Sequence, residues 1–279
     1  MKPYFGSTHT HSTGSDGSLT PEKVVKKAIE LKWNYVYFTD HYLSPPKSLF
    51  KKNNYFNQEY AEEIERLIEK YKNQIEICFG AEFDWIEEYS DWLKEESKKR
   101  NYDYIIGSIH DISYKKGHYT GIGWTKEEWA ENAKKFGGPK PYLKEYYKQT
   151  RDLIKSGIYD AVGHLDCIKT SNKDQSLFSE NEEWYKKEIL KTLDLIQKQK
   201  MAIEVNVSGL RKCDSPFPSP WIIKEAKKRN IPITIGADAH QDKHFDNELL
   251  IKGIEIIKKA GYKELVRFKK RKMIKMKLK

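Results

Sequence analysis

Seven short apolar segments, separated by helical patterns, constrain the fold of this chain more than any other feature. They lie at residues 4–8, 35–39, 75–81, 104–109, 161–164, 202–207 and 232–237. Their β-branched and aromatic residues form nearly continuous apolar runs, which is typical of parallel strands covered by helices. Strands that alternate with helices build right-handed βαβ units. We therefore predict an α/β fold, and the alternation fits an open sheet as well as a closed barrel.

The intervening segments carry the periodicity and the start signals of helices. Thr20 is a typical N-cap residue, and Pro21 stands at the first helical position after it. Further helices are predicted at residues 57–72, 126–135, 141–156, 181–199, 219–229 and 246–260. Since no linker or repeat divides these elements, we predict a single domain over residues 1–279. Its basic C-terminal tail, residues 263–279, is expected to form a helix or to fray.

Composition excludes several classes of protein. No stretch approaches the ~18 consecutive apolar residues that a membrane-spanning helix needs. The three cysteines, Cys78, Cys167 and Cys213, are widely separated and lack the spacing of a disulfide framework. The first residues also lack the apolar region of a secretory signal. We expect a cytoplasmic protein without a membrane partner.

The net charge of +10 raises the question of nucleic acid binding. A nucleic-acid site would gather lysines and arginines in a patch with aromatic platforms. Here the lysines are spread over helical faces, and residues 263–279 are the one dense block. Solvated helix surfaces account for this distribution, so a nucleic-acid partner is not expected.

Histidines and carboxylates recur where the apolar segments end. These residues are His9, His11, Asp16, His41, Glu82, His110, His164, Asp238 and His240. A single His-x-His pair is more often structural than metal-binding. In α/β barrels, however, the carboxyl ends of several strands together build the active site. Imidazole and carboxylate groups are ligands for Zn, Mn and Fe. The recurrence therefore predicts a metal centre with more than one ion.

The same residues fall into motifs that resemble a known superfamily. The motifs are His9-x-His11-x4-Asp16-Gly17, Thr39-Asp40-His41, Gly80-x-Glu82-x-Asp84, Gly107-Ser108-x-His110, Gly163-His164 and Asp238-Ala239-His240. In this order they resemble the polymerase and histidinol phosphatase (PHP) superfamily, and within it the monofunctional L-histidinol-phosphate phosphatases. The resemblance runs from residue 4 to about residue 260. It implies a distorted (β/α)7 barrel with a metal centre at the C-terminal ends of the strands.

The resemblance also implies three divalent metal ions, which could be Mn, Zn or Fe. His9, His11, Glu82 and Asp238 would hold the first ion, Glu82, His110 and His164 the second, and Asp16, His41 and His240 the third. Glu82 would then bridge two ions, and Glu82, Asp238 and His240 are the expected catalytic residues. Some relatives carry histidine at the position of Asp16, and a carboxylate there favours Mn or Fe over Zn.

The implied activity is hydrolysis of a small phosphate monoester, L-histidinol phosphate, in histidine biosynthesis. A water bridging two metals would have its pKa lowered to near ~7, and the hydroxide would attack phosphorus. Arg211 is the first candidate to bind the phosphate, because its fork suits a phosphate dianion. Lys169 is the second, with an ordinary solvated lysine as the alternative.

Other residues are weaker candidates for substrate binding. Ser108 could bond near the phosphate or simply end its strand. Asp84 could bind the substrate ammonium or support a histidine ligand. The insertions at residues 42–58 and 111–125 are rich in aromatic residues, and they could cover the pocket and stack on an imidazole. The aromatic loops around Tyr42, Trp85 and Tyr114 are expected to contact the substrate.

Two alternatives to this activity stay open at the level of sequence. One is a related phosphoesterase that acts on nucleotides or nucleic-acid ends, which the positive charge would suit. The other is a metal-binding accessory domain without catalysis. The complete set of ligand residues argues against an inactive domain.

Overall fold

Seven parallel strands form the frame of the protein in a computed structural model that describes residues 5–42 and 58–278. The strands follow the order β1-β2-β4-β5-β8-β9-β10, and the short strand β3 pairs with β4. Their bounds are β1 Gly6–Ser7, β2 Tyr35–Phe38, β3 His41–Tyr42, β4 Glu76–Asp84, β5 Tyr104–Ser108, β8 Ala161–Val162, β9 Ala202–Asn206 and β10 Ile233–Gly236. The apolar segments predicted from sequence therefore form the frame of the sheet.

The chain closes this sheet by joining the segment after β1 to β10 and the residues beyond it. The amide of Thr8 donates to the carbonyl oxygen of Ile235 at 3.0 Å, and that of Asp238 donates to the carbonyl oxygen of His9 at 2.9 Å. A further bond of 3.0 Å joins the amide of His11 to the carbonyl oxygen of Ala239. Of the two arrangements that the alternation allowed, the protein thus adopts the distorted (β/α)7 barrel.

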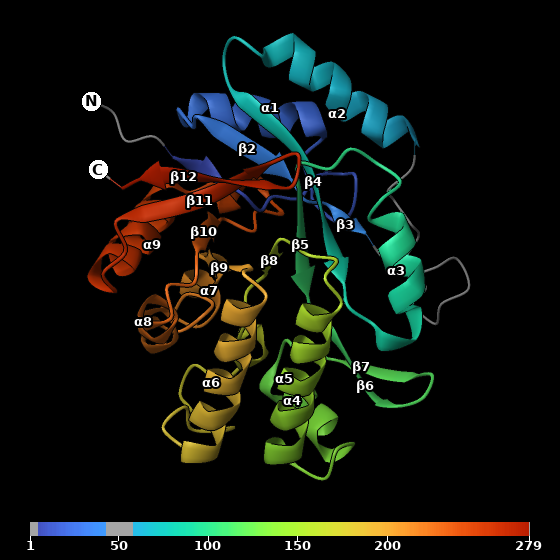
Figure 1. Ribbon diagram of the computed structural model, residues 1–279, viewed down its shortest axis with the longest axis vertical. Coiled ribbons are helices and arrows are strands. Elements are labelled where there is room, and N and C mark those ends of the chain that lie inside the picture. Colours follow the sequence, from blue (N-terminus) through green and yellow to red (C-terminus); the bar gives the residue numbers. More distant parts are fainter. Residues whose placement is uncertain (1–4, 43–57, 279) are drawn as a thin grey trace.

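Helices surround the barrel (Figure 1). They are α1 Pro21–Glu30, α2 Gln58–Tyr71, α3 Ser90–Glu96, α4 Lys126–Lys134, α5 Pro139–Lys155, α6 Glu183–Lys198, α7 Ser208–Lys212, α8 Pro220–Lys228 and α9 Asn247–Lys259. The Thr20 hydroxyl accepts from the amide of Lys23, which confirms the predicted start of α1. The short helices α3 and α7 were not predicted. Within the described residues, no helix combines the length and apolar character needed to cross a membrane.

The predicted insertion at residues 111–125 begins with a small antiparallel hairpin. Its strands are β6 Asp111–Lys115 and β7 His118–Gly121. A loop then leads into α4, whose N-terminus carries a capping box formed by Thr125 and Glu128. The other predicted insertion, residues 42–58, lies almost entirely outside the described residues.

The prediction for the C-terminal tail was wrong. Its residues form an antiparallel hairpin of β11 Glu264–Lys269 and β12 Lys272–Lys277, drawn in red in Figure 1. Leu265, Val266 and Phe268 are buried, and Phe268 stacks on Tyr104 with ring centroids 5.1 Å apart. Burial of these apolar side chains outweighs the solvation that the lysines favour. Because Tyr104 begins β5, the hairpin covers the amino end of the barrel.

Candidate metal centre

The nine predicted ligand residues come together at the carboxyl end of the barrel, opposite the hairpin. They follow β1, lie in β3 and β4, or follow β5, β8 and β10. The backbone at Asp238 has a φ of 50°, which is uncommon for a residue other than glycine. Such conformations persist where the surrounding structure holds them, often at functional sites. Four overlapping groups of ligand atoms result, and no atom in a group is more than 4.8 Å from another. Three of these groups contain predicted ligands alone, and the fourth combines His41 and His110 with Asp84.

The first group joins the loop after β1 to Glu82 and Asp238. The Nε2 atoms of His9 and His11 lie 3.0 Å apart. Glu82 Oε2 is 3.2 Å from the former and 3.4 Å from the latter. Asp238 Oδ1 lies 3.4 Å from His11 Nε2. A tetrahedral ion with bonds of 2.0–2.1 Å separates its ligand atoms by about 3.4 Å. These spacings therefore suit a bound divalent ion.

The second group uses the other oxygen of Glu82. Glu82 Oε1 lies 2.9 Å from His164 Nε2 and 3.8 Å from His110 Nε2. The Ser108 hydroxyl also donates a hydrogen bond to Oε1. Glu82 is buried at the end of β4, between the two groups. Its two carboxylate oxygens thus face different sets of histidines.

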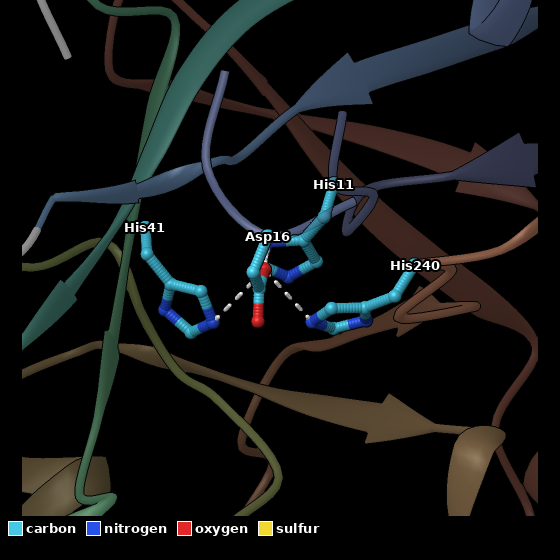
Figure 2. A group of neighbouring side chains, drawn as sticks. All are labelled: His11, Asp16, His41 and His240. Carbon is cyan, nitrogen blue, oxygen red and sulfur yellow. Dashed lines mark ion pairs between the residues drawn. The ribbon is translucent and has the colours of Figure 1, made fainter. Parts of the chain in front are cut away.

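The third group surrounds Asp16, as Figure 2 shows. Asp16 Oδ1 lies 3.3 Å from His240 Nε2 and 3.8 Å from His41 Nε2. His11 belongs to this group as well, because its Nδ1 is 3.8 Å from the same oxygen. The group is more open than the other two, since Asp16 is half-exposed. His11 therefore stands between the first and third groups, which the sequence did not indicate.

The electrostatics of the cluster favour ionised carboxylates. Burial opposes ionisation of Glu82, but the nearby His9, His41 and His110 outweigh it and hold the pKa of Glu82 well below its usual range. In Asp238, burial is likewise outweighed by Lys212 and His9, so its pKa is also low. Ionised carboxylates and neutral imidazoles are the donor groups that divalent ions require.

Carboxylates outside the ligand set orient two of the histidines. His9 Nδ1 lies 2.8 Å from Glu204 Oε1, and His110 Nδ1 is bonded to Asp84. A proton held on Nδ1 by a carboxylate leaves Nε2 free as the ligand atom. Burial alone would lower the pKa of His110, but Asp84 and Glu82 raise it to about 9, so an ion that binds Nε2 must displace a proton from that nitrogen. Of the two roles considered for Asp84, the structure favours support of a histidine.

Asp40 fixes the loop that carries Asp16. Its carboxylate accepts from the amide of Ser12 at 2.7 Å and from the hydroxyl of Ser15 at 2.7 Å. The Tyr60 hydroxyl of α2 donates to the same carboxylate. These bonds connect the loop of the third group to helix α2.

The predicted phosphate-binding cations differ in their surroundings. Arg211 lies on α7, where its positive charge and the negative charge of Asp238 attract each other. Its Nη1 is buried without a hydrogen-bond partner among the described residues. Lys169, in contrast, is 3% exposed. Its ammonium lies 2.9 Å from Asp166 Oδ2 and 3.1 Å from the carbonyl oxygen of Pro216, and it also donates to the hydroxyls of Ser215 and Ser219. These contacts use all its protons, so Lys169 serves the structure of this loop.

Three residues near the metal groups were missed in the sequence. Glu204 is fully buried within the apolar strand β9, and a charged residue in such a strand was an available signal. Lys212 Nζ lies 3.8 Å from Asp238 Oδ2 and 5.1 Å from the ring centroid of Trp124. Nothing in the sequence marked Lys212 or Trp124 individually, because their proximity depends on the fold.

Comparison with known proteins gives a consistent result. The protein family described as "PHP domain" matches residues 7–208 of this chain. A histidinol-phosphatase of Lactococcus lactis subsp. lactis is 31% identical, and the alignment covers 96% of this chain and 95% of that protein. The histidinol-phosphatase of Bacillus subtilis is 26% identical, with 86% of this chain and 94% of that protein covered.

A solved structure shares the fold. It is the histidinol phosphate phosphatase of Lactococcus lactis subsp. lactis in complex with zinc, L-histidinol and phosphate. The two structures superpose with a TM-score of 0.75 at 22% sequence identity, and the alignment covers 95% of this chain and 97% of the other. At this level of identity the superposition supports the barrel architecture.

Proposed function

Because this chain belongs to the PHP domain family, we propose that it is a metal-dependent phosphomonoesterase that hydrolyses L-histidinol phosphate to L-histidinol and phosphate. The two relatives described above are named histidinol-phosphatase, and this chain aligns with nearly the whole length of each. One observation carries the mechanism: the two oxygens of the buried Glu82 face two different histidine groups. This arrangement suits a carboxylate that bridges two ions.

We assign the ligands to three divalent ions. His9, His11, Glu82 and Asp238 would hold one, Glu82, His110 and His164 the second, and Asp16, His41 and His240 the third. Zn, Mn and Fe all accept this set of nitrogen and oxygen donors. Ions bound here would lower the pKa of water and offset the negative charge of a phosphate ester. Glu82, Asp238 and His240 are the proposed catalytic residues, since they would hold the ions that activate water and bind the phosphate.

The side chains around the ions have separate tasks in this proposal. Arg211 binds the phosphate, because its buried Nη1 has no partner among the described residues. Asp84 holds the proton on Nδ1 of His110, so that its Nε2 stays available. Ser108 orients Glu82 through the bond to Oε1. We further propose that the enzyme acts in histidine biosynthesis in the cytoplasm, as one domain over residues 1–279.

The test is a phosphate-release assay of the metal-loaded protein with three classes of substrate. These are L-histidinol phosphate, nucleoside monophosphates and short 5′-phosphorylated oligonucleotides. We expect kcat/KM to be highest for histidinol phosphate and to fall to background after a chelator removes the ions. Added Zn, Mn or Fe should restore it. Faster release from a nucleotide or an oligonucleotide would replace the proposal by the nucleotide-directed alternative.

The bridging assignment has its own test. Glu82→Gln should reduce the metal content at two of the three sites and abolish turnover, since the amide is a poor bridging ligand. A variant with the metal content and rate of the wild type would show that Glu82 does not bridge.

A further inference from the structure

Trp124 is unusually exposed for its type. It lies in the loop between β7 and α4 and is 55% exposed, more than any other large apolar side chain in the part of the chain that the structure describes. The neighbouring Ile122, in contrast, is fully buried.

The backbone that carries Trp124 is held in place from several sides. Its amide donates to Glu128 Oε2 at 2.9 Å, and the Ser171 hydroxyl donates to the carbonyl oxygen of Gly123 at 3.0 Å. Gly123 has a φ of 79°, and a side chain there would meet the backbone of Trp129 at 2.5 Å. The loop therefore presents the indole from a fixed position, which lowers the entropy lost on binding.

The indole lies beside the metal groups. Its ring centroid is 6.5 Å from that of His110, and the two planes are inclined by 31°. Lys212 Nζ lies over the ring at 5.1 Å and reaches within 3.8 Å of Asp238. Trp124 therefore stands at the edge of the first and second groups, next to a cation that faces them.

The aromatic residues predicted for substrate stacking are less suitable. Tyr42 is buried, stacks on Phe83 and donates its hydroxyl to Glu96. Trp85 is buried as well, and its ring contacts Tyr159. Tyr114 lies on the β6–β7 hairpin, where its ring packs on His118 and Phe136. None of these rings is as exposed beside a metal group as Trp124.

We infer that Trp124 is the platform on which the imidazole ring of the substrate stacks, so that it determines specificity in the proposed reaction. This inference rests on the proposed function. Four covalent bonds separate the ester oxygen of histidinol phosphate from its imidazole, a span of about 5 Å when extended. A phosphate held by the ions and Arg211 would therefore leave the imidazole within reach of an indole whose ring centroid lies 6.5 Å from that of His110. Stacked aromatic rings attract each other beyond the area they bury.

Two substitutions and two substrates test this inference. Trp124→Ala should raise KM for histidinol phosphate about tenfold, as the loss of one stacking contact predicts, while kcat changes less. Trp124→Phe should keep KM within about threefold, because a smaller ring still stacks. 2-Aminoethyl phosphate has the phosphate and the ammonium but no ring, and its KM should be the same in all three proteins.

A binding measurement supplies a readout that does not depend on turnover. Calorimetric titration of the metal-loaded protein with L-histidinol in the presence of phosphate should show the same tenfold loss for Trp124→Ala. The matched control is Trp184→Ala, which removes another indole with a lysine over its ring, Lys140 at 5.5 Å, on the outer helix α6. This control should bind L-histidinol like the wild type.

The outcomes separate this inference from the function on which it rests. A wild-type protein that neither hydrolyses histidinol phosphate nor binds L-histidinol would overturn both. A wild-type protein that does so, with a Trp124→Ala variant of unchanged KM and affinity, would overturn the role of Trp124 alone. An equal loss with 2-aminoethyl phosphate would also overturn it, because the contact would then not involve the ring.

Discussion

Replacement of Glu204 by glutamine tests how far the metal centre depends on a residue that binds no ion itself. Glu204 is fully buried and accepts three contacts. His9 Nδ1 lies 2.8 Å from Oε1, the amide of His164 donates to Oε2 at 2.9 Å, and the side chain of Asn206 donates to Oε2 at 3.1 Å. Glu204 thus connects the first two metal groups through β9.

Glutamine has nearly the same shape, but one of its two acceptor oxygens becomes an NH2 donor. If the new NH2 group takes the place of Oε2, it meets two other donors, the amide of His164 and the side-chain amide of Asn206, and both of these lose their acceptor. If it faces His9, it forces the proton of that ring onto Nε2 and blocks the ligand atom. Loss of such a supporting bond typically costs 10–100-fold in metal affinity, which corresponds to about 1.4–2.7 kcal/mol.

The assay is equilibrium dialysis of the metal-free protein against buffered zinc, followed by measurement of bound metal. The control is Glu188→Gln, which makes the same chemical change at a buried carboxylate that pairs with Arg151 at 2.9 Å, between α5 and α6. Glu204→Gln should bind zinc 10–100-fold more weakly, and Glu188→Gln should bind it like the wild type. Equal affinities in all three proteins would refute the supporting role of Glu204.

Two further substitutions test other parts of the structure. Arg211→Ala should lower kcat/KM for histidinol phosphate by roughly 10²-fold or more, because a charge-assisted contact of ~2–3 kcal/mol is lost. The metal content of this variant should be unchanged, because Arg211 is not a metal ligand. A parallel loss of metal would contradict the assignment of Arg211 to the phosphate. Phe268→Ala should lower the free energy of unfolding by about 3–5 kcal/mol in a urea titration, whereas Met273→Ala, on the exposed strand β12, should change it by less than about 0.5 kcal/mol. Equal effects of these two changes would mean that the hairpin does not stabilise the barrel.

Short-range patterns in the sequence were enough to predict the strands, most helices and the positions of the ligand residues. Every apolar segment except the one at residues 202–207 leads into a histidine or a carboxylate, and the end of a strand is a local property that a single segment reveals. The capping signals at Thr20 predicted the start of α1 for the same reason. The convergence of the nine residues then followed from the rule that parallel strands share one carboxyl edge.

The tertiary structure decided which atoms face one another. The bonds that join the segment after β1 to β10 connect residues more than two hundred positions apart, and they bring His9 and Asp238 into one group. No local pattern encodes such a contact, so the bonding of Lys169 to the loop around Ser219 and the placement of Trp124 beside His110 were not predictable. The tail shows the same limit. Its lysines indicated a solvated segment, but Phe268 packs on Tyr104 in the folded barrel, and burial against that surface stabilises the hairpin.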